Sequence, residues 1–101
     1  LRQLAREVRA HIRDSDSLGR WGGEEFILLL PETGADDAMH VAESIRSALE
    51  HTHFDGPGTV TVSLGVSSFQ PGDTLGALLK RADRALYRAK EQGRNRAVPD
   101  T

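Results

Sequence analysis

The sequence predicts an α+β fold in which helices flank an antiparallel sheet. Apolar residues recur with helical spacing in three separate segments. A glycine-centred hairpin follows the first of these segments, and a strictly alternating run of residues precedes the third. The 101 residues are 38% hydrophobic and 28% charged, with no cysteine, which is ordinary for one globular domain without disulfides. No apolar run approaches the roughly 20 residues that a membrane-spanning helix needs.

The first predicted element is a helix at the start of the chain, and a β-hairpin follows it. The helix should end near Arg13-Asp14, where Asp14-Ser15-Asp16-Ser17 favours a turn. The hairpin strands are predicted near residues 18–21 and 25–30, on either side of two glycines. The helix buries one apolar stripe, made by Leu1, Leu4, Ala5, Val8 and Ile12.

The second predicted helix begins near Thr33-Gly34-Ala35-Asp36 and runs to about residue 51. Acidic residues in its first turn suit the positive end of the helix dipole. Residues 53–58 are predicted to form a loop, because Gly56-Pro57-Gly58 is the clearest break in the chain. The buried face of this helix is predicted from Ala38, Ala42, Ile45 and Leu49.

A half-buried strand and a long helix are predicted next. In the strand, Val60, Val62, Leu64 and Val66 alternate with small residues, so a ligand or another backbone can lie close to the opposite face. Pro71-Gly72-Asp73-Thr74 predicts a turn and an N-cap, and Gly93 predicts the end of the helix. Ala97-Val98 is a candidate final strand. The helix stripe comprises Leu75, Leu78, Leu79, Ala82, Leu86 and Ala89.

The predicted order of elements is α-β-β-α-β-α. With one strand placed in front, it begins β-α-β-β-α-β, the ferredoxin-like or palm arrangement. In that arrangement the added strand lies between the second hairpin strand and the alternating strand. Residues 26–30 are apolar on both faces, as expected for a strand covered on both sides, and without a neighbour they would form an exposed edge. We therefore expect residues 1–101 to be the C-terminal part of a longer domain, lacking its N-terminal strand.

The hairpin turn has the composition of a metal–phosphate site. Glu24 and Glu25 directly follow Gly22 and Gly23, where an apolar strand begins. Carboxylates beside a core need compensation, and a metal ion is the usual one. Glycines have no Cβ, so a phosphate can approach their backbone N–H groups. An isolated Gly-Gly turn followed by glutamate is usually only a hairpin, so this pattern alone leaves both interpretations open.

A basic segment near the C-terminus is hidden by the formal net charge of −2. Such a segment attracts nucleotides or nucleic acid, but it can equally be a solvated helix face. Nucleic acid is disfavoured because the basic residues alternate with the apolar stripe and no aromatic platform accompanies them. Between residues 80 and 96 the basic residues are Lys80, Arg81, Arg84, Arg88, Lys90, Arg94 and Arg96, against Asp83 and Glu91.

The pentamer Gly22-Gly23-Glu24-Glu25-Phe26 resembles the signature of the GGDEF family, the diguanylate cyclases, in its GGEEF form. Residues 13–16 resemble the RxxD inhibitory motif of that family, upstream of the signature. Residues 62–66 resemble its later strand, and residues 79–95 resemble its C-terminal helix and the end of that helix. The resemblance covers essentially the whole chain. It implies a nucleotidyl-cyclase, palm-like fold.

The resemblance implies an activity and a set of site residues. The family condenses two GTP into cyclic di-GMP and two pyrophosphates, in a homodimer in which each 3′-hydroxyl attacks the α-phosphate of the other GTP. Carried over, Glu25 is a ligand of Mg²⁺ or Mn²⁺, and Glu24 helps to deprotonate the 3′-hydroxyl or binds metal. Gly22 and Gly23 bring the backbone up to the nucleotide. The basic pair that holds the terminal phosphates corresponds to Lys90 and Arg94.

The resemblance also implies an inhibitory site for the product, cyclic di-GMP, at Arg13 and Asp16. An arginine can fork onto a guanine edge or a phosphate, and a carboxylate can accept from guanine N–H groups. By themselves, the two residues would most often be an ion pair at a helix end. Some family members add an arginine from the following helix; Ser44 stands at that place here, and Arg46 lies two residues on.

Two functions remain open within the family: an active cyclase, and a non-catalytic receptor for cyclic di-GMP. In the family, an upstream metal-binding Asp and the groups that read guanine precede the part that this chain resembles. We therefore expect residues 1–101 by themselves to be inactive or nearly so. We also expect a cytoplasmic location, with sensory domains and any membrane attachment in upstream segments.

Overall fold

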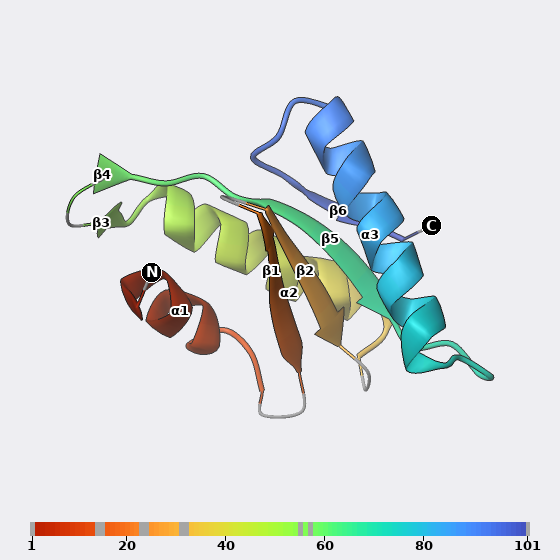
Figure 1. Cartoon of the computed structure of the whole chain (residues 1–101). Coiled ribbons are helices and arrows are strands. Elements are labelled where there is room, and N and C mark those ends of the chain that lie inside the picture. Colours follow the sequence, from red (N-terminus) through yellow and green to blue (C-terminus); the bar gives the residue numbers. More distant parts are fainter. Residues whose placement is uncertain are drawn as a thin grey trace.

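The computed structural model describes residues 2–13, 16–22, 25–30, 33–54, 56 and 58–100. Their elements confirm the predicted order α-β-β-α-β-α and add one short hairpin before the alternating strand (Figure 1). The elements are α1 (Arg2–Arg9), β1 (Ser17–Gly22), β2 (Glu25–Leu30), α2 (Ala35–Glu50), β3 (His53–Phe54), β4 (Gly58–Thr59), β5 (Ser63–Ser68), α3 (Leu75–Glu91) and β6 (Ala97–Pro99).

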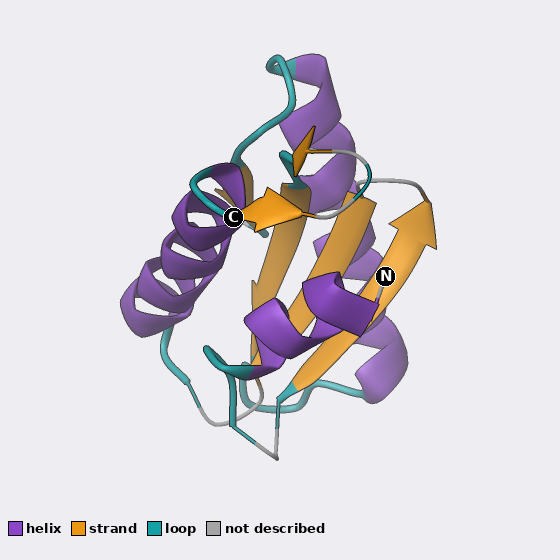
Figure 2. Cartoon of the chain, turned by 90° about the vertical axis from the view of Figure 1, so that its left-hand side faces the viewer, coloured by secondary structure: helices purple, strands orange, loops and turns teal. Residues whose placement is uncertain are grey.

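The main sheet has the strand order β1-β2-β5-β6, and its three longer strands, β1, β2 and β5, lie side by side in Figure 2. Strands β1 and β2 are antiparallel, which confirms the predicted hairpin. Strands β2 and β5 are parallel, with Glu25 opposite Ser63 and Leu30 opposite Ser68, and β5 and β6 are also parallel. The prediction of an antiparallel sheet is therefore wrong for two of the three strand pairings.

Strands β2 and β5 pair directly with each other. They therefore leave no gap at the position between them where an additional N-terminal strand was predicted. Two strands that are both antiparallel to a strand between them run in the same direction. They therefore form a parallel pair when they meet directly. Helix α2 supplies the long crossover that a parallel connection needs. As a result β2 has a partner on each side and is not an exposed edge.

The sheet is covered by helices on both faces. Helices α1 and α2 lie on one face and α3 lies on the other (Figure 1). Phe26, Leu28 and Leu30 of β2 pack in the larger cluster with the buried residues of α1 and α2. Ile27 points the other way and packs against Ala82 and Leu86 of α3. The prediction that residues 26–30 are covered on both sides is confirmed.

Strand β5 is buried on both faces, so the prediction of a half-buried strand is wrong. Helix α3 covers the face that carries the small residues. A Cβ added at Gly65 would lie 2.1 Å from the carbonyl oxygen of Ala82 and 2.6 Å from the nitrogen of Leu86. The small residues therefore admit another backbone, and that backbone belongs to α3.

Both predicted ends of α3 are confirmed. The Thr74 hydroxyl accepts a hydrogen bond from the Ala77 N–H at 3.1 Å, and the helix ends before Gly93. The predicted stripe is correct at four of its residues but wrong at Leu75 and Leu79, which are exposed. Leu75 lies in the first turn and Leu79 at the margin of the buried face. The buried face consists of Leu78, Ala82, Ala85, Leu86 and Ala89.

Helix α1 and the segment after α2 also differ from their predictions. The helix ends at Arg9 rather than near Arg13. The His11 N–H bonds to the Val8 carbonyl at i−3 spacing, which closes the helix. The predicted loop at residues 53–58 contains the β3–β4 pair, which places Phe54 in the core. The four predicted core residues of α2 are all buried, as expected.

The C-terminal strand β6 forms one edge of the main sheet. The Arg88 guanidinium Nη2 donates to the Pro99 carbonyl oxygen at 2.7 Å and so ties α3 to this strand. Across the ranges that the structure describes, none of the helices is long and apolar enough to span a bilayer.

Candidate nucleotide-binding site

Three of the residues predicted for the site meet at the end of the sheet where β2 begins. Glu25 is the first residue of β2, Lys90 lies in the last turn of α3, and Arg94 lies just beyond that helix. The Lys90 Nζ is 3.3 Å from Glu25 Oε1, and the Arg94 Nη1 is 3.6 Å from Glu25 Oε2. The exposed fractions of the side chains are 26% for Glu25, 34% for Lys90 and 62% for Arg94. This is an open cluster of two cations and one carboxylate.

Backbone pairing holds Glu25 in place. On one side it lies opposite Gly22, where the ladder between β1 and β2 shifts register, and on the other it lies opposite Ser63. Gly22 ends β1 and therefore lies beside the cluster, as the hairpin prediction requires. Gly23 and Glu24 lie outside the described residues, so their roles remain predictions.

The turn after α3 places Arg94. The Gly93 N–H bonds to the Lys90 carbonyl at 3.3 Å and the Arg94 N–H bonds to the Ala89 carbonyl at 2.9 Å, which is the hydrogen-bond pair of a Schellman motif. Gly93, Arg94 and Asn95 have φ values of +116°, +65° and +45°. Glycine adopts such values readily, whereas residues with a Cβ rarely do. The Arg96 Nε donates to the Arg94 carbonyl oxygen at 3.1 Å.

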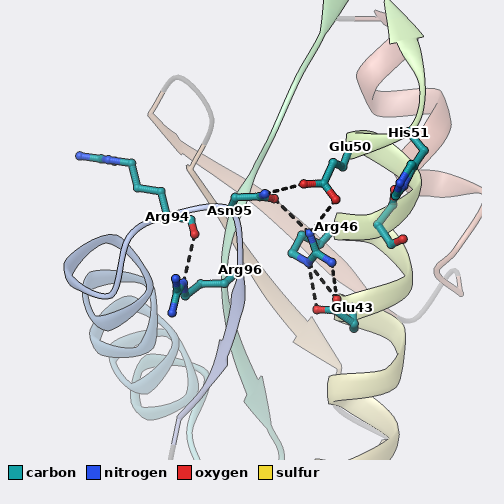
Figure 3. Close-up of polar contacts among 8 residues, drawn as sticks. Glu43, Arg46, Glu50, His51, Arg94, Asn95 and Arg96 are labelled. Atoms are coloured by element: carbon teal, nitrogen blue, oxygen red, sulfur yellow. Dashed lines mark hydrogen bonds and ion pairs between the residues drawn. The ribbon is translucent and has the colours of Figure 1, made fainter.

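Asn95 points from this turn toward α2, where it joins a polar network (Figure 3). The Arg46 Nη1 donates to Asn95 Oδ1 at 3.1 Å and to Glu50 Oε1 at 3.3 Å, and Asn95 Nδ2 donates to Glu50 Oε2 at 2.6 Å. Arg46 also bonds to Glu43 through Nε, at 2.9 and 3.0 Å to the two carboxylate oxygens. All five bonds lie within a single connected network between α2 and the turn.

This network shifts the pKa of its members. The hydrogen bond from Arg46 lowers the pKa of Glu43, and the bond to Glu43 raises the pKa of Arg46. The hydrogen bond from Asn95, followed by the one from Arg46, lowers the pKa of Glu50. No local pattern in the sequence predicted a role for Asn95. Its position after a glycine at the end of a helix was a usable signal, because Asn tolerates the left-handed conformation better than most residues.

Arg13 and Asp16 form a local ion pair, which lies beyond the end of α1 at Arg9 rather than at a helix end. The Asp16 carboxylate accepts from the Arg13 backbone N–H at 2.9 Å and from its guanidinium at 3.4 Å. The Arg13 guanidinium also donates to the Thr33 hydroxyl. The side chain of Asp16 is 3% exposed and that of Arg13 is 57% exposed, so of the two only Arg13 is largely open to solvent. Arg46, the arginine nearest to the place where some family members add one to the inhibitory site, instead bonds to Asn95. Among the hydrogen bonds of the described residues, none joins Arg46 to Arg13.

The donor set for a metal in the described part of the chain is small. No group of three or more His, Cys, Asp or Glu side chains there could hold a metal ion. Of the two predicted metal ligands, Glu25 is described and Glu24 is not. A single carboxylate still fits Mg²⁺, which proteins commonly bind through one or two carboxylates together with substrate phosphates. Thus Glu25 suits a metal that arrives with a nucleotide.

A second basic–acidic network lies toward the other end of α3. The Arg81 guanidinium donates to both oxygens of Asp73 at 2.7 Å and to Asp100 Oδ2 at 2.9 Å. Its Nη2 also donates to the Ser68 carbonyl oxygen, and the Ser67 hydroxyl donates to Asp100. The bond from Arg81, followed by that from the Gln70 N–H, lowers the pKa of Asp73 to about 2. This network joins α3, the end of β5 and the C-terminal segment, and it was not predicted from the sequence.

A comparison with known families identifies the chain. The sequence model described as "Diguanylate cyclase, GGDEF domain" matches residues 1–96. The chain belongs to the GGDEF family. It is similar to diguanylate cyclase DgcM of Escherichia coli K12, with 45% identity over 95 residues, which cover 94% of this chain and 23% of that protein. The chain therefore spans about a quarter of the length of that curated relative.

Solved structures of GGDEF domains have the same fold. The active GGEEF domain of a diguanylate cyclase from Vibrio cholerae is 38% identical, with a TM-score of 0.80, covering 100% of this chain and 66% of that chain. The GGDEF domain of DgcB from Caulobacter crescentus, in complex with cyclic di-GMP, is 26% identical, with a TM-score of 0.74, covering 98% of this chain and 61% of that chain. The predicted family and the predicted α+β fold class are confirmed.

Proposed function

We propose that this chain belongs to the catalytic domain of a diguanylate cyclase, which converts two GTP into cyclic di-GMP and two pyrophosphates. The observation that carries the proposal is the meeting of Glu25 with Lys90 and Arg94 beside the GGEEF hairpin. Membership of the GGDEF family and similarity to proteins named diguanylate cyclases support the same conclusion.

The open cluster suits the binding of a nucleotide triphosphate. Without nucleotide, Lys90 and Arg94 neutralise Glu25 across 3.3 and 3.6 Å. The phosphates of GTP carry more negative charge than one carboxylate, so they compete for both cations and leave the Glu25 oxygens free for Mg²⁺ or Mn²⁺. The bound metal ion neutralises charge on the phosphates. The two basic side chains orient the phosphate tail through charge-assisted hydrogen bonds.

The reaction then consists of two phosphoryl transfers in a homodimer whose subunits each hold one GTP. The 3′-oxygen of each ribose forms a bond to the α-phosphorus of the other GTP. The bond from that phosphorus to the bridging oxygen breaks, and pyrophosphate leaves. We assign Glu24 as the acceptor of the 3′-hydroxyl proton or as a further metal ligand.

The test is turnover of GTP with Mg²⁺ by the natural full-length polypeptide, with cyclic di-GMP and pyrophosphate measured separately. Glu25→Gln keeps the size of the side chain and removes its charge, so we expect turnover to fall by at least about 100-fold. Glu91→Gln is the matched control, because Glu91 is an exposed glutamate at the end of α3 outside the cluster. Equal activity in the two variants would contradict the assigned role of Glu25.

We further propose that cyclic di-GMP binds at Arg13 and Asp16 as a product inhibitor. The exposed guanidinium of Arg13 can leave Thr33 and bond a guanine edge or a phosphate. We expect Arg13→Ala to relieve inhibition by added cyclic di-GMP while the initial rate stays within about twofold. Inhibition that persists unchanged in this variant would place the inhibitory site elsewhere.

The second candidate function is a receptor that binds cyclic di-GMP without making it. The exposed Arg13 beside Asp16 favours it, because this arrangement needs no catalytic metal. Calorimetry of the full-length polypeptide with a GTP analogue and with cyclic di-GMP separates the two functions. A receptor binds cyclic di-GMP and gives no turnover, whereas a cyclase binds both ligands and releases pyrophosphate.

A further inference from the structure

We propose that Asn95 is a positioning residue, which Arg46 and Glu50 of α2 hold so that Arg94 is aimed at the nucleotide phosphates. The inference deepens the proposed function and rests on it, because it takes Arg94 as a phosphate ligand. It adds a link between Arg46 and Glu50 of α2 and the geometry of the open cluster.

The backbone of the turn after α3 needs support from outside itself. Gly93, Arg94 and Asn95 all have positive φ values, and two of the three carry a Cβ. Residues with a Cβ disfavour this conformation, so a turn of this kind persists where surrounding contacts hold it. The Schellman bonds account for Gly93 and for the N–H of Arg94. They do not hold Asn95.

The side chain of Asn95 provides that support. Its Oδ1 accepts from Arg46 Nη1 at 3.1 Å, and its Nδ2 donates to Glu50 Oε2 at 2.6 Å. Arg46 Nη1 also donates to Glu50 at 3.3 Å, so the three side chains form a closed ring of contacts (Figure 3). The cation faces the amide oxygen and the carboxylate faces the amide nitrogen, which is the complementary orientation. The network therefore anchors Asn95 by both polar atoms of its amide.

Anchoring Asn95 fixes the direction of Arg94. In Figure 3 the Asn95 side chain points toward α2, whereas the Arg94 side chain points away from it. Arg94 is 62% exposed, and its contact with Glu25 is long at 3.6 Å, so its own side-chain contacts hold it weakly. Its backbone is held at the N–H by the bond to the Ala89 carbonyl, at the carbonyl by the bond from Arg96, and through its anchored neighbour Asn95. A fixed backbone reduces the conformational entropy that Arg94 loses when it binds phosphate.

The central variant is Asn95→Gly in the natural full-length polypeptide. Glycine keeps access to positive φ and removes both side-chain bonds, so it tests the anchor without adding backbone strain. We measure the dissociation constant of a non-hydrolysable GTP analogue with Mg²⁺ by calorimetry. We expect an increase of about 5- to 10-fold, and in turnover assays an increase in KM larger than the decrease in kcat.

A double-mutant cycle distinguishes positioning from general stabilisation. If Asn95 acts through Arg94, then Asn95→Gly has little further effect in the Arg94→Ala background. Asp37→Asn is the control: it removes an exposed carboxylate from the first turn of α2, away from Arg46 and Glu50, and we expect analogue affinity within about twofold of the parent. Glu50→Ala removes one side of the ring from α2 and is the second test variant, with the same expected direction.

The melting temperature of each variant is measured in parallel, and variants are compared only where they are folded. The same loss of affinity in the parent and in the Arg94→Ala background overturns the positioning role. Unchanged affinity in both Asn95→Gly and Glu50→Ala, with a loss in Arg94→Ala, also overturns it. Unchanged affinity in Arg94→Ala is a different result, because it removes the phosphate-binding role from Arg94 and so contradicts the proposed function itself.

Discussion

Helix α3 pairs basic side chains with carboxylates toward both of its ends, but the two networks are built differently. Toward the N-terminal end, Arg81 lies 2.7 Å from Asp73 and 2.9 Å from Asp100, whose side chains are only 8% and 3% exposed. At the C-terminal end, Lys90 in the last turn and Arg94 just beyond the helix lie 3.3 and 3.6 Å from a half-buried Glu25. The first network is closed, and further hydrogen bonds complete it. The second is open to solvent and loosely paired.

This difference indicates that the closed network at Arg81 stabilises the fold, whereas the open network at Lys90 and Arg94 is suited to binding a ligand, although both contain the same residue types. A charge that is removed from water needs short, complete pairing, and breaking such a pair costs stability. A pair at the surface contributes little to stability and can exchange its partner for a ligand. We therefore expect substitutions at the open network to change nucleotide binding, and substitutions at the closed network to change stability.

The largest expected effect is on binding at the open network. In Lys90→Ala/Arg94→Ala, two charge-assisted bonds to phosphate are lost, so we expect the affinity for a GTP analogue to fall by at least about 100-fold. Calorimetry measures the affinity, and the melting temperature should hardly change. Lys80→Ala, an exposed lysine on the same helix, is the control. A large drop in melting temperature in the double variant would show that the open network also contributes to the stability of the fold.

The next effect is on stability at the closed network. Arg81→Met keeps much of the side-chain volume but leaves Asp73 and Asp100 without their cation. We expect the melting temperature to fall on the order of 10 °C. Circular dichroism on heating measures it, with Arg84→Met on the exposed face of α3 as the matched control. Equal melting temperatures for the two variants would mean that the Arg81 contacts contribute no net stability.

Low pH should reduce the contribution of the closed network to the stability of the fold. The pKa of Asp73 is about 2 in the folded protein, below its ordinary value of 3.8. A carboxyl group whose pKa is lowered by folding contributes stability above its ordinary pKa and loses it as the pH falls through the folded value. We expect the free energy of unfolding to decrease between about pH 4 and pH 2 in part through Asp73. Asp73→Asn should show a shallower decrease over this window, and an identical slope would contradict the role of Asp73.

The smallest effect is on stability at the open network. For Lys90→Ala alone, we expect the free energy of unfolding to change by no more than about 0.5 kcal/mol, because its pairing with Glu25 is partly exposed. Urea denaturation at low and high salt measures this change. Since salt screens exposed pairs, the difference between the parent and the variant should shrink further at high salt. A difference that grows with salt would contradict this interpretation.

The sequence predicted the elements well because each carries a local signal. The hairpin, the core residues of α2 and the cap at Thr74 depend on neighbours within a few positions, and all are confirmed. The meeting of Glu25 with Lys90 and Arg94 was accessible only through resemblance to a family. No spacing rule links Glu25 to residues that lie 65 and 69 positions further along the chain.

The features that escaped prediction depend on contacts distant in sequence. The small residues around Gly65 predicted that a ligand or another backbone lies close, but only the structure shows that the neighbour is the backbone of α3. The Arg46–Asn95 bond spans 49 positions and the Arg81–Asp100 pair spans 19, so periodicity says nothing of either. The parallel pairing of β2 with β5 likewise follows from which strands meet, and that is a property of the whole sheet.

The short strand β6 has a consequence for self-association. An edge strand presents unpaired N–H and C=O groups, which can recruit a strand from another molecule and begin aggregation. In β6 one of these groups is absent, because Pro99 has no N–H, and the Pro99 carbonyl oxygen already accepts from Arg88. At Pro99, a strand from another molecule therefore has no N–H to bond and must compete with Arg88 for the carbonyl oxygen. The bond from Arg88 thus ties α3 to β6 and also occupies an acceptor that an incoming strand would use.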